Sequence, residues 1–393
     1  MTCLERLMEA AITSHDDSLN PSSRRAASGV PMSSSTRRST HAHDRCEVGP
    51  PPRGPPGRRS TIVGIGAGTA ARRDPACRHQ MTYLEGDGSL HDRVLGMLLG
   101  LACAEAIGAP FSGEERVDRW EIERWAYDTR PLHWSSMTRM LHTVLARLSV
   151  EPRLGAVDGA GTALPMEFSA LEIRGLREHD ARRPLRRGES NVVRGGTGNG
   201  AAVWGVAVAP TDHDLDRLAA IARASARLTH PHEIGQDGAA AVAIAAAIAF
   251  RTPQRPLQLD PTVVLGAISA RLTSDAFRHA LEAVHTLLTD RWPDPVADVV
   301  GAGPIASESV PAALVAVLRH PDSYVATVKE AVGFGGDTAR IAAISAAISA
   351  ARLGTAAIPV AWVDRLDRAG HLRGLAAGLV RATLRSAKAR RCV

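Results

Sequence analysis

The sequence of 393 residues predicts an all-α fold, a large bundle of many helices around one core. Aromatic residues form only 4% of the chain, and alanine is abundant in its later half. Small side chains of this kind let helices pack closely. Beyond residue 90, apolar residues recur at helical spacing, and no segment shows the convincing alternation of apolar and polar residues that strands require.

The first helix is expected where apolar residues share one face from Val94 to Ala102, and a second around residues 137–148. Further helices are predicted over residues 165–179, 199–209, 213–228, 236–250, 260–271, 273–289, 308–319, 322–333, 337–353 and 372–387. Glycine and proline separate these segments. Residues 180–198 and 290–306 are predicted to form loops.

The first 80 residues differ in composition from the rest and are predicted to be a disordered tail. They are rich in Arg, Ser, Pro and Gly, and such a stretch cannot bury enough apolar surface to offset its ordering entropy. The sequence that begins at Met81 has a regular helical pattern. An equally good explanation of the tail is that translation starts at Met81 and that residues 1–80 are a mis-assigned extension. The glycines at residues 64–68 are interpreted as a linker. One helical domain is expected over residues 85–390.

Charge and cysteine content favour a protein that binds neither nucleic acid nor membrane. The formal charge is +6, but 12 arginines against 7 acidic residues place +5 of it within residues 1–80. The body is therefore nearly neutral. Its longest apolar run, residues 238–250, is too short to cross a bilayer and predicts a buried core helix. Five scattered cysteines without paired spacing fit a reducing compartment, so a cytoplasmic location is expected.

Four motifs occur along the chain in a characteristic order. They are DRVLGMLLGLA at residues 92–102 followed by AIGAP, GNGAA at residues 198–202, LTHPH at residues 228–232, and GGDT at residues 335–338. In this order they resemble the ADP-ribosylglycohydrolase family, which includes the dinitrogenase-reductase-activating glycohydrolase. The resemblance extends to about residue 365. It implies an orthogonal bundle of helices around a cleft, and hydrolysis of the bond between ADP-ribose and a protein side chain.

The resemblance also implies two magnesium or manganese ions in active members, where hard cations bind oxygen ligands and activate water. The family's first metal motif, WTDDT, corresponds to WSSMT here. Ser135 retains a hydroxyl group as a vestigial ligand. Ser136 and Met137 occupy the positions of the two lost carboxylates, and a thioether is a poor ligand for a hard cation.

The second metal motif, DTDT, reads DTAR in this sequence. Asp337 survives, whereas Ala339 and Arg340 stand where two further ligands are expected. With so few anionic oxygens and an added guanidinium, no binuclear metal centre and no cofactor are predicted. From the residues alone, Asp337 has a second interpretation as the N-cap of the following helix, its carboxylate accepting a helix N–H. An ion pair between Asp337 and Arg340, three residues apart, is also expected.

The other candidate site residues come from the remaining motifs. Glu105 and His230 are the candidate catalytic residues that the resemblance implies. Glu105 lies in an apolar helix, where a buried carboxylate needs a partner or a function. His230 precedes a proline at a helix end, and an interpretation as a cap of the helix carbonyls is equally good. The candidate ligand-binding residues are Gly198, Asn199, Gly200 and Trp204.

The function predicted from these residues is that of a degenerate family member. It binds ADP-ribose or an ADP-ribosylated protein, with weak or no hydrolysis. One alternative is an active hydrolase with a single metal ion or none, in which Arg340 supplies the positive charge. The other alternative is a helical interaction protein without a ligand, whose cleft is filled by side chains.

Overall fold

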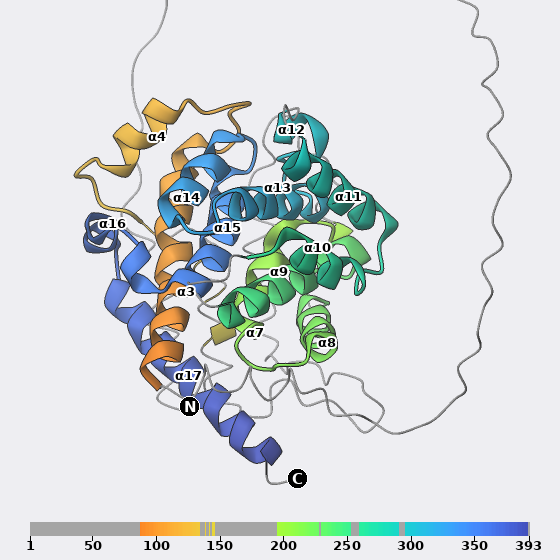
Figure 1. The fold of residues 1–393 in the computed structure, drawn as a ribbon. Helices are drawn as coiled ribbons and strands as arrows, with labels where there is room; N and C mark the ends of the chain where they lie inside the picture. Colours follow the sequence, from red (N-terminus) through yellow and green to blue (C-terminus); the bar gives the residue numbers. More distant parts are fainter. Residues whose placement is uncertain are drawn as a thin grey trace, which may run out of the picture. The chain divides into compact units, whose positions relative to one another are not determined.

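The computed structural model describes residues 87–133, 138, 141, 144–145, 195–227, 229–252, 259–290 and 295–391. All of them belong to one unit that begins at Ala71, and the predicted tail lies outside the described residues. The helices and short 3₁₀ turns of this unit are α3 (Asp87–Gly108), η2 (Ala109–Phe111), α4 (Arg119–Ala126), η4 (Asn199–Ala201), α7 (Ala202–Val208), α8 (Leu215–Ala226), α9 (Glu233–Arg251), α10 (Pro261–Ser269), α11 (Asp275–Thr289), α12 (Val296–Val299), α13 (Ala306–Arg319), α14 (Tyr324–Gly333), α15 (Thr338–Leu353), η5 (Thr355–Ala357), α16 (Val360–Arg365) and α17 (Ala369–Arg391) (Figure 1).

The predicted all-α fold is confirmed. Within the described ranges the backbone forms helices, turns and two isolated bridges, which join Leu132 to Leu366 and Gly198 to Ile305. Three short helices, α4, α12 and α16, were not predicted from the sequence. Their apolar signal is weak, because α4 buries only Ile122 and Ala126, and α12 buries only Val296 within the segment predicted as a loop. The predicted helix over residues 165–179 and most of residues 137–148 lie outside the described residues.

Small residues let the central helices approach closely. α15 packs against α3, α9 and α14, and α9 also packs against α7 and α8. A Cβ atom added at Gly100 of α3 would lie 3.0 Å from the Cβ atom of Ala350 of α15. One added at Gly205 of α7 would lie 2.2 Å from the carbonyl oxygen of Ala239. The alanine and glycine content that predicted the bundle is therefore used at its helix contacts.

The apolar run at residues 238–250 forms most of α9, and nearly all of it is buried, which confirms the predicted core helix. By length and composition, α3 and α9 could each cross a membrane. Their apolar windows are 78% and 83% buried inside the protein, as is usual for core helices.

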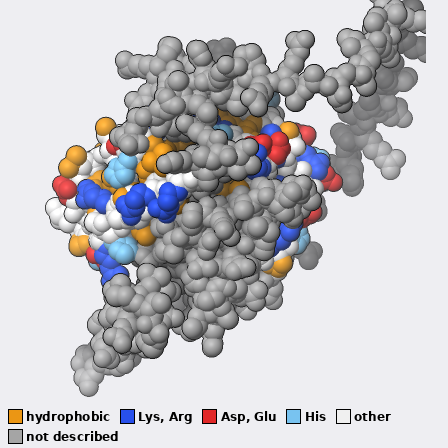
Figure 2. Space-filling model, turned by 90° about the horizontal axis from the view of Figure 1, so that it is seen from below, with side chains coloured by type: hydrophobic (Ala, Val, Ile, Leu, Met, Phe, Trp, Pro, Cys, Tyr) orange, Lys and Arg blue, Asp and Glu red, His pale blue; other side chains and the backbone are white. Residues whose placement is uncertain are grey.

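α17 carries a basic outer face. It contains no Asp or Glu, and Arg373, Arg381 and Arg385 are exposed on it. Figure 2 shows a band of Lys and Arg side chains on the face seen from below, and α17 runs along the lower edge of Figure 1. The positive charge outside the first 80 residues is thus unevenly distributed.

Candidate functional site

Two of the sequence motifs meet at the start of α15. The turn that contains Asn199 and the turn that contains Asp337 are both bonded to the segment between α12 and α13, residues 301–305. The backbone N–H of Asn199 donates to the carbonyl of Pro304 at 3.0 Å, and the N–H of Asp337 donates to the carbonyl of Ala302 at 2.7 Å. Residues 301–305, which we call the bridging loop, therefore hold the two turns side by side.

The glycines before Asp337 are required by the path of the backbone. Gly335 and Gly336 have φ angles of 77° and 66°, in the left-handed region that disfavours other residues. A Cβ atom at Gly335 would lie 2.1 Å from the carbonyl oxygen of Glu115, and one at Gly336 would lie 2.0 Å from that of Ala302. The turn is thus enclosed between the segment after α3 and the bridging loop.

The carboxylate of Asp337 lies at the centre of a polar cluster. Its Oδ2 atom accepts a hydrogen bond from Nδ2 of Asn199 at 3.0 Å and forms an ion pair with a guanidinium nitrogen of Arg340, also at 3.0 Å. Asp337 and Asn199 are buried, and the Arg340 side chain is only 12% exposed. We call these three residues the Asp337 cluster. The expected ion pair with Arg340 is therefore present.

Asp337 is the N-cap residue of α15, as the sequence predicts, but its side chain makes no capping hydrogen bond. The prediction that the carboxylate accepts a helix N–H was wrong. The physical reason is competition, because a guanidinium and a side-chain amide offer this carboxylate charged and oriented donors. The next residue, Thr338, donates its hydroxyl to the carbonyl of Gly108 at 2.7 Å and lies 3.2 Å from the hydroxyl of Ser112. These contacts fix the start of α15 against the end of α3.

The donor set that the structure describes does not fit a pair of hard cations. Ala339 offers no ligand, Arg340 is itself a cation, and the remaining carboxylate already accepts from two donors. Among the described residues, no three His, Cys, Asp or Glu side chains gather as metal ligands would. Of the first metal motif, Ser135, Ser136 and Met137 lie outside the described residues.

Glu105 has a partner within the fold. Its carboxylate is fully buried on α3 and accepts hydrogen bonds from the backbone N–H of Thr138, at 3.3 Å, and from the hydroxyl of the same residue. Thr138 is the last residue of the WSSMT segment. Glu105 therefore ties α3 to the segment that the sequence resemblance relates to the family's first metal motif. Its catalytic role stays a prediction.

His230 and Trp204 lie together, away from solvent. Both are 0% exposed, and their rings meet edge to face with centroids 6.2 Å apart. Nδ1 of His230 is 2.7 Å from the hydroxyl of Thr229. This surrounding favours packing for Trp204 over ligand contact, because it is one of the largest fully buried side chains. The predicted pair of catalytic residues, Glu105 and His230, is thus joined to two separate sets of partners.

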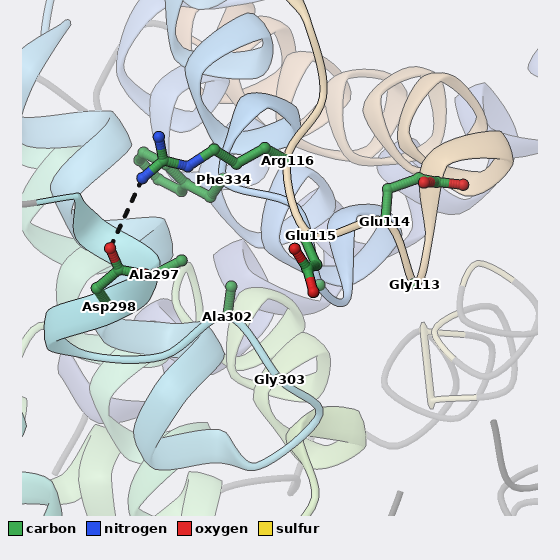
Figure 3. Close-up of a pocket in the computed structure, with 10 residues that line it drawn as sticks. Gly113, Glu114, Glu115, Arg116, Ala297, Asp298, Ala302, Gly303 and Phe334 are labelled. Atoms are coloured by element: carbon green, nitrogen blue, oxygen red, sulfur yellow. Dashed lines mark ion pairs between the residues drawn. The ribbon is translucent and has the colours of Figure 1, made fainter. Parts of the chain in front are cut away.

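A hollow adjoins the Asp337 cluster. It has a volume of about 580 Å³ and lies between the segment after α3, α12 and the bridging loop (Figure 3). Its lining includes Gly336, Ala302 and Phe334, and an ion pair of 3.7 Å between Arg116 and Asp298 spans one side. The sequence predicted a loop over residues 290–306, but not the contacts of the bridging loop with the two turns. The available signal was the pair Gly301 and Gly303 ahead of α13, since loop glycines often permit a close backbone approach.

Comparison with known proteins agrees with this architecture. A family model described as ADP-ribosylglycohydrolase matches residues 87–388. The chain is similar to "ADP-ribosylhydrolase ARH3" of Bos taurus, with 25% identity over 321 residues, 69% of this chain and 87% of that protein. It is also 24% identical to the protein of the same name from Homo sapiens over 322 residues, 69% of this chain and 88% of that protein.

A solved chain described as "ADP-ribosylglycohydrolase-related protein complex" has the same fold, with a TM-score of 0.55 and 19% identity over 75% of this chain and 99% of that chain. The four sequence motifs, the helical architecture and a family match that spans most of the chain agree with one another. The chain belongs to the ADP-ribosylglycohydrolase family.

Proposed function

We propose that this chain binds ADP-ribose, or a protein that carries it, through the Asp337 cluster without divalent metal, and hydrolyses the linkage weakly or not at all. The observation that carries the proposal is the ion pair between Arg340 and Asp337. The guanidinium of Arg340 pairs with Asp337, the one carboxylate that remains of the second metal motif. A side chain of α15 therefore carries the positive charge that a cation supplies in active members.

Electrostatics supports this assignment. Two divalent cations about 3.5–4 Å apart need several anionic ligands to offset their repulsion. Asp337 supplies one negative charge, and Arg340 already neutralises it at 3.0 Å. A cation placed beside Arg340 would meet a like charge. Arginine is also well suited to phosphate, because its planar donors bind two oxygens at once.

The relatives give the ligand class. Those named above are called ADP-ribosylhydrolases, and they match most of this chain. The turn that carries Asn199 is retained in this sequence, while the carboxylates of the metal motifs other than Asp337 are replaced. Retention of the ligand turn together with loss of ligands for the cation favours binding over catalysis.

Calorimetric titration with ADP-ribose tests the proposal, in parallel with magnesium and with EDTA. We expect binding heat of similar size in both conditions. Arg340→Ala should weaken binding about tenfold, the loss expected for one charge-assisted contact. Arg373→Ala, which removes an exposed arginine of α17, is the matched control and should bind like the wild type. No heat at millimolar ADP-ribose in either condition would refute the proposal.

An assay of product release distinguishes an active hydrolase from a protein that only binds ADP-ribose. The chain is incubated with ADP-ribosylated arginine and serine peptides, and free ADP-ribose is measured with and without EDTA. Release that resists EDTA and disappears in Glu105→Gln would identify a metal-independent enzyme. Neither binding nor release would leave the interaction protein as the better description.

A further inference from the structure

The side chain of Glu308 contacts the bridging loop. Glu308 lies in the first turn of α13, and its carboxylate accepts a hydrogen bond from the backbone N–H of Gly303. Two other acidic residues in first turns are more exposed. Asp275 at the start of α11 has an 83% exposed side chain, and Glu233 at the start of α9 is exposed. Glu308 is half-buried under the loop.

The loop is shaped around this side chain. A Cβ atom at Gly301 would lie 2.8 Å from Cγ of Glu308, and one at Gly303 would lie 2.3 Å from Oε2 of Glu308. Gly301 also has a φ angle of 82°. Both glycines therefore permit the contact with Glu308. Larger residues at either position would displace the carboxylate or the loop.

The position of the loop decides the spacing of the Asp337 cluster. Ala302 lies between the two glycines and accepts from the N–H of Asp337, and Pro304 follows them and accepts from the N–H of Asn199. On the other side, the N–H of Ala306 donates to the carbonyl of Thr197 at 2.9 Å. A shift of the loop would therefore move Asp337 and Asn199 relative to each other and change the 3.0 Å contact between their side chains.

A carboxylate held in this place has an energetic cost. Burial raises the pKa of Glu308, and the hydrogen bond from Gly303 opposes that rise. A half-buried acid of this kind is retained where its contacts serve a purpose. An apolar side chain could fill the same space, but it could not accept from the N–H of Gly303.

We propose that Glu308 is a positioning residue for the ligand site: through Gly303 it fixes the bridging loop, which sets the distance between Asn199 and Asp337. The part of the proposal that concerns ligand affinity rests on the proposed function. The part that concerns the position of Asn199 does not, and the two are measured separately.

The direct readout is the side-chain amide of Asn199. The chain contains three asparagines, so protein labelled with ¹⁵N-asparagine gives few side-chain amide signals, and that of Asn199 is assigned by its loss in Asn199→Ser. We expect Glu308→Ala to shift this signal and Glu308→Gln to leave it in place, because glutamine keeps the length and an acceptor oxygen. Asp275→Ala is the matched control and should not shift it. An unshifted signal in Glu308→Ala, or an equal shift in Glu308→Gln, would overturn the proposal.

A double-mutant cycle distinguishes loss of the contact between Glu308 and Gly303 from a general loss of folding. Gly303→Ala should shift the Asn199 signal as Glu308→Ala does, because the new methyl group displaces the carboxylate. Adding Gly303→Ala to Glu308→Ala should then produce little further change, since the clash is gone. Strictly additive effects of the two substitutions would contradict a shared contact.

Ligand affinity is the second readout, measured well below the melting temperature of each variant. We expect Glu308→Ala to bind ADP-ribose about tenfold more weakly and Glu308→Gln to bind within about threefold of the wild type. If the wild type binds no ADP-ribose, the proposed function fails while the Asn199 signal still decides the role of Glu308. If the signal shifts while a measurable affinity does not change, Glu308 does not position a ligand site.

Discussion

The Asp337 cluster and the pair formed by Trp204 and His230 show two fates for residues of the same family motifs. Asn199 and Trp204 are separated by four residues in one turn and helix. The side-chain amide of Asn199 donates to the carboxylate of Asp337, whereas the ring of Trp204 packs against that of His230. Position within a motif therefore does not determine the role of a residue. The neighbours that the fold supplies determine it.

The largest effect is expected in the interior pair. Trp204→Ala should reduce the free energy of unfolding by about 3–5 kcal/mol, because it leaves a large cavity. Trp204→Phe should cost less, since the indole N–H has no hydrogen-bond partner among the described residues. Urea denaturation measures both. Trp362→Ala, at another fully buried tryptophan, is the control for size and should be similarly destabilised.

Ligand binding by the Trp204 variants tests whether this interior pair is distinct from the Asp337 cluster. At a temperature where the variants are folded, we expect Trp204→Phe to bind ADP-ribose like the wild type. A tenfold loss in this variant would return Trp204 to the ligand site and break the distinction between the two regions.

A smaller loss of stability is expected at the turn before α15. Gly336→Ala should destabilise the protein by about 3 kcal/mol, because the residue has a positive φ and the new methyl group would meet the carbonyl of Ala302. Gly374→Ala in α17 is the matched control. A methyl group added there would meet no atom of the described residues within 4 Å, and alanine should stabilise the helix by up to about 1 kcal/mol. Equal thermal melting of the two variants would contradict the close backbone contact.

Asn199→Ala should reverse the balance seen for Trp204, with a small loss of stability and a large loss of binding. Removing one hydrogen bond to Asp337 should cost about 1 kcal/mol of stability, while ADP-ribose binding should weaken about tenfold. Asn199→Asp should cost more stability, because two carboxylates would then lie in contact. Calorimetry and urea denaturation on the two variants provide the measurements. Binding that is unaffected in both would remove Asn199 from the site.

The smallest effect concerns pH. Burial raises the pKa of Glu308 in the folded protein above its ordinary value of 4.5. The folded state then holds this proton more tightly than the unfolded state, so its contribution to stability is full below the ordinary pKa and is lost as pH rises through the folded one. As pH rises from below this ordinary value through the raised pKa of the folded state, the stability of Glu308→Gln relative to the wild type should therefore increase. A difference that does not vary with pH would contradict the raised pKa.

The helices were predictable from the sequence where they bury a whole face, as α9 and α15 do, because their apolar pattern is long and unambiguous. Short helices such as α4 leave no such pattern. Within the site, Asp337 and Asn199 could be named from motifs, and the ion pair with Arg340 from spacing. The bridging loop and Glu308 could not, because their roles arise from backbone carbonyls and from the tertiary fit of glycines around a side chain.

Titration with Mn²⁺, followed by electron paramagnetic resonance, tests most directly the claim that Arg340 has taken the place of a cation. We expect no binding tighter than about millimolar in the wild type, since a binuclear site needs several carboxylates. The variant that combines Ser136→Asp, Met137→Asp, Ala339→Asp and Arg340→Thr should bind two ions tightly. Two tightly bound Mn²⁺ ions in the wild type would contradict the account, and a folded quadruple variant without metal would refute the correspondence of the motifs.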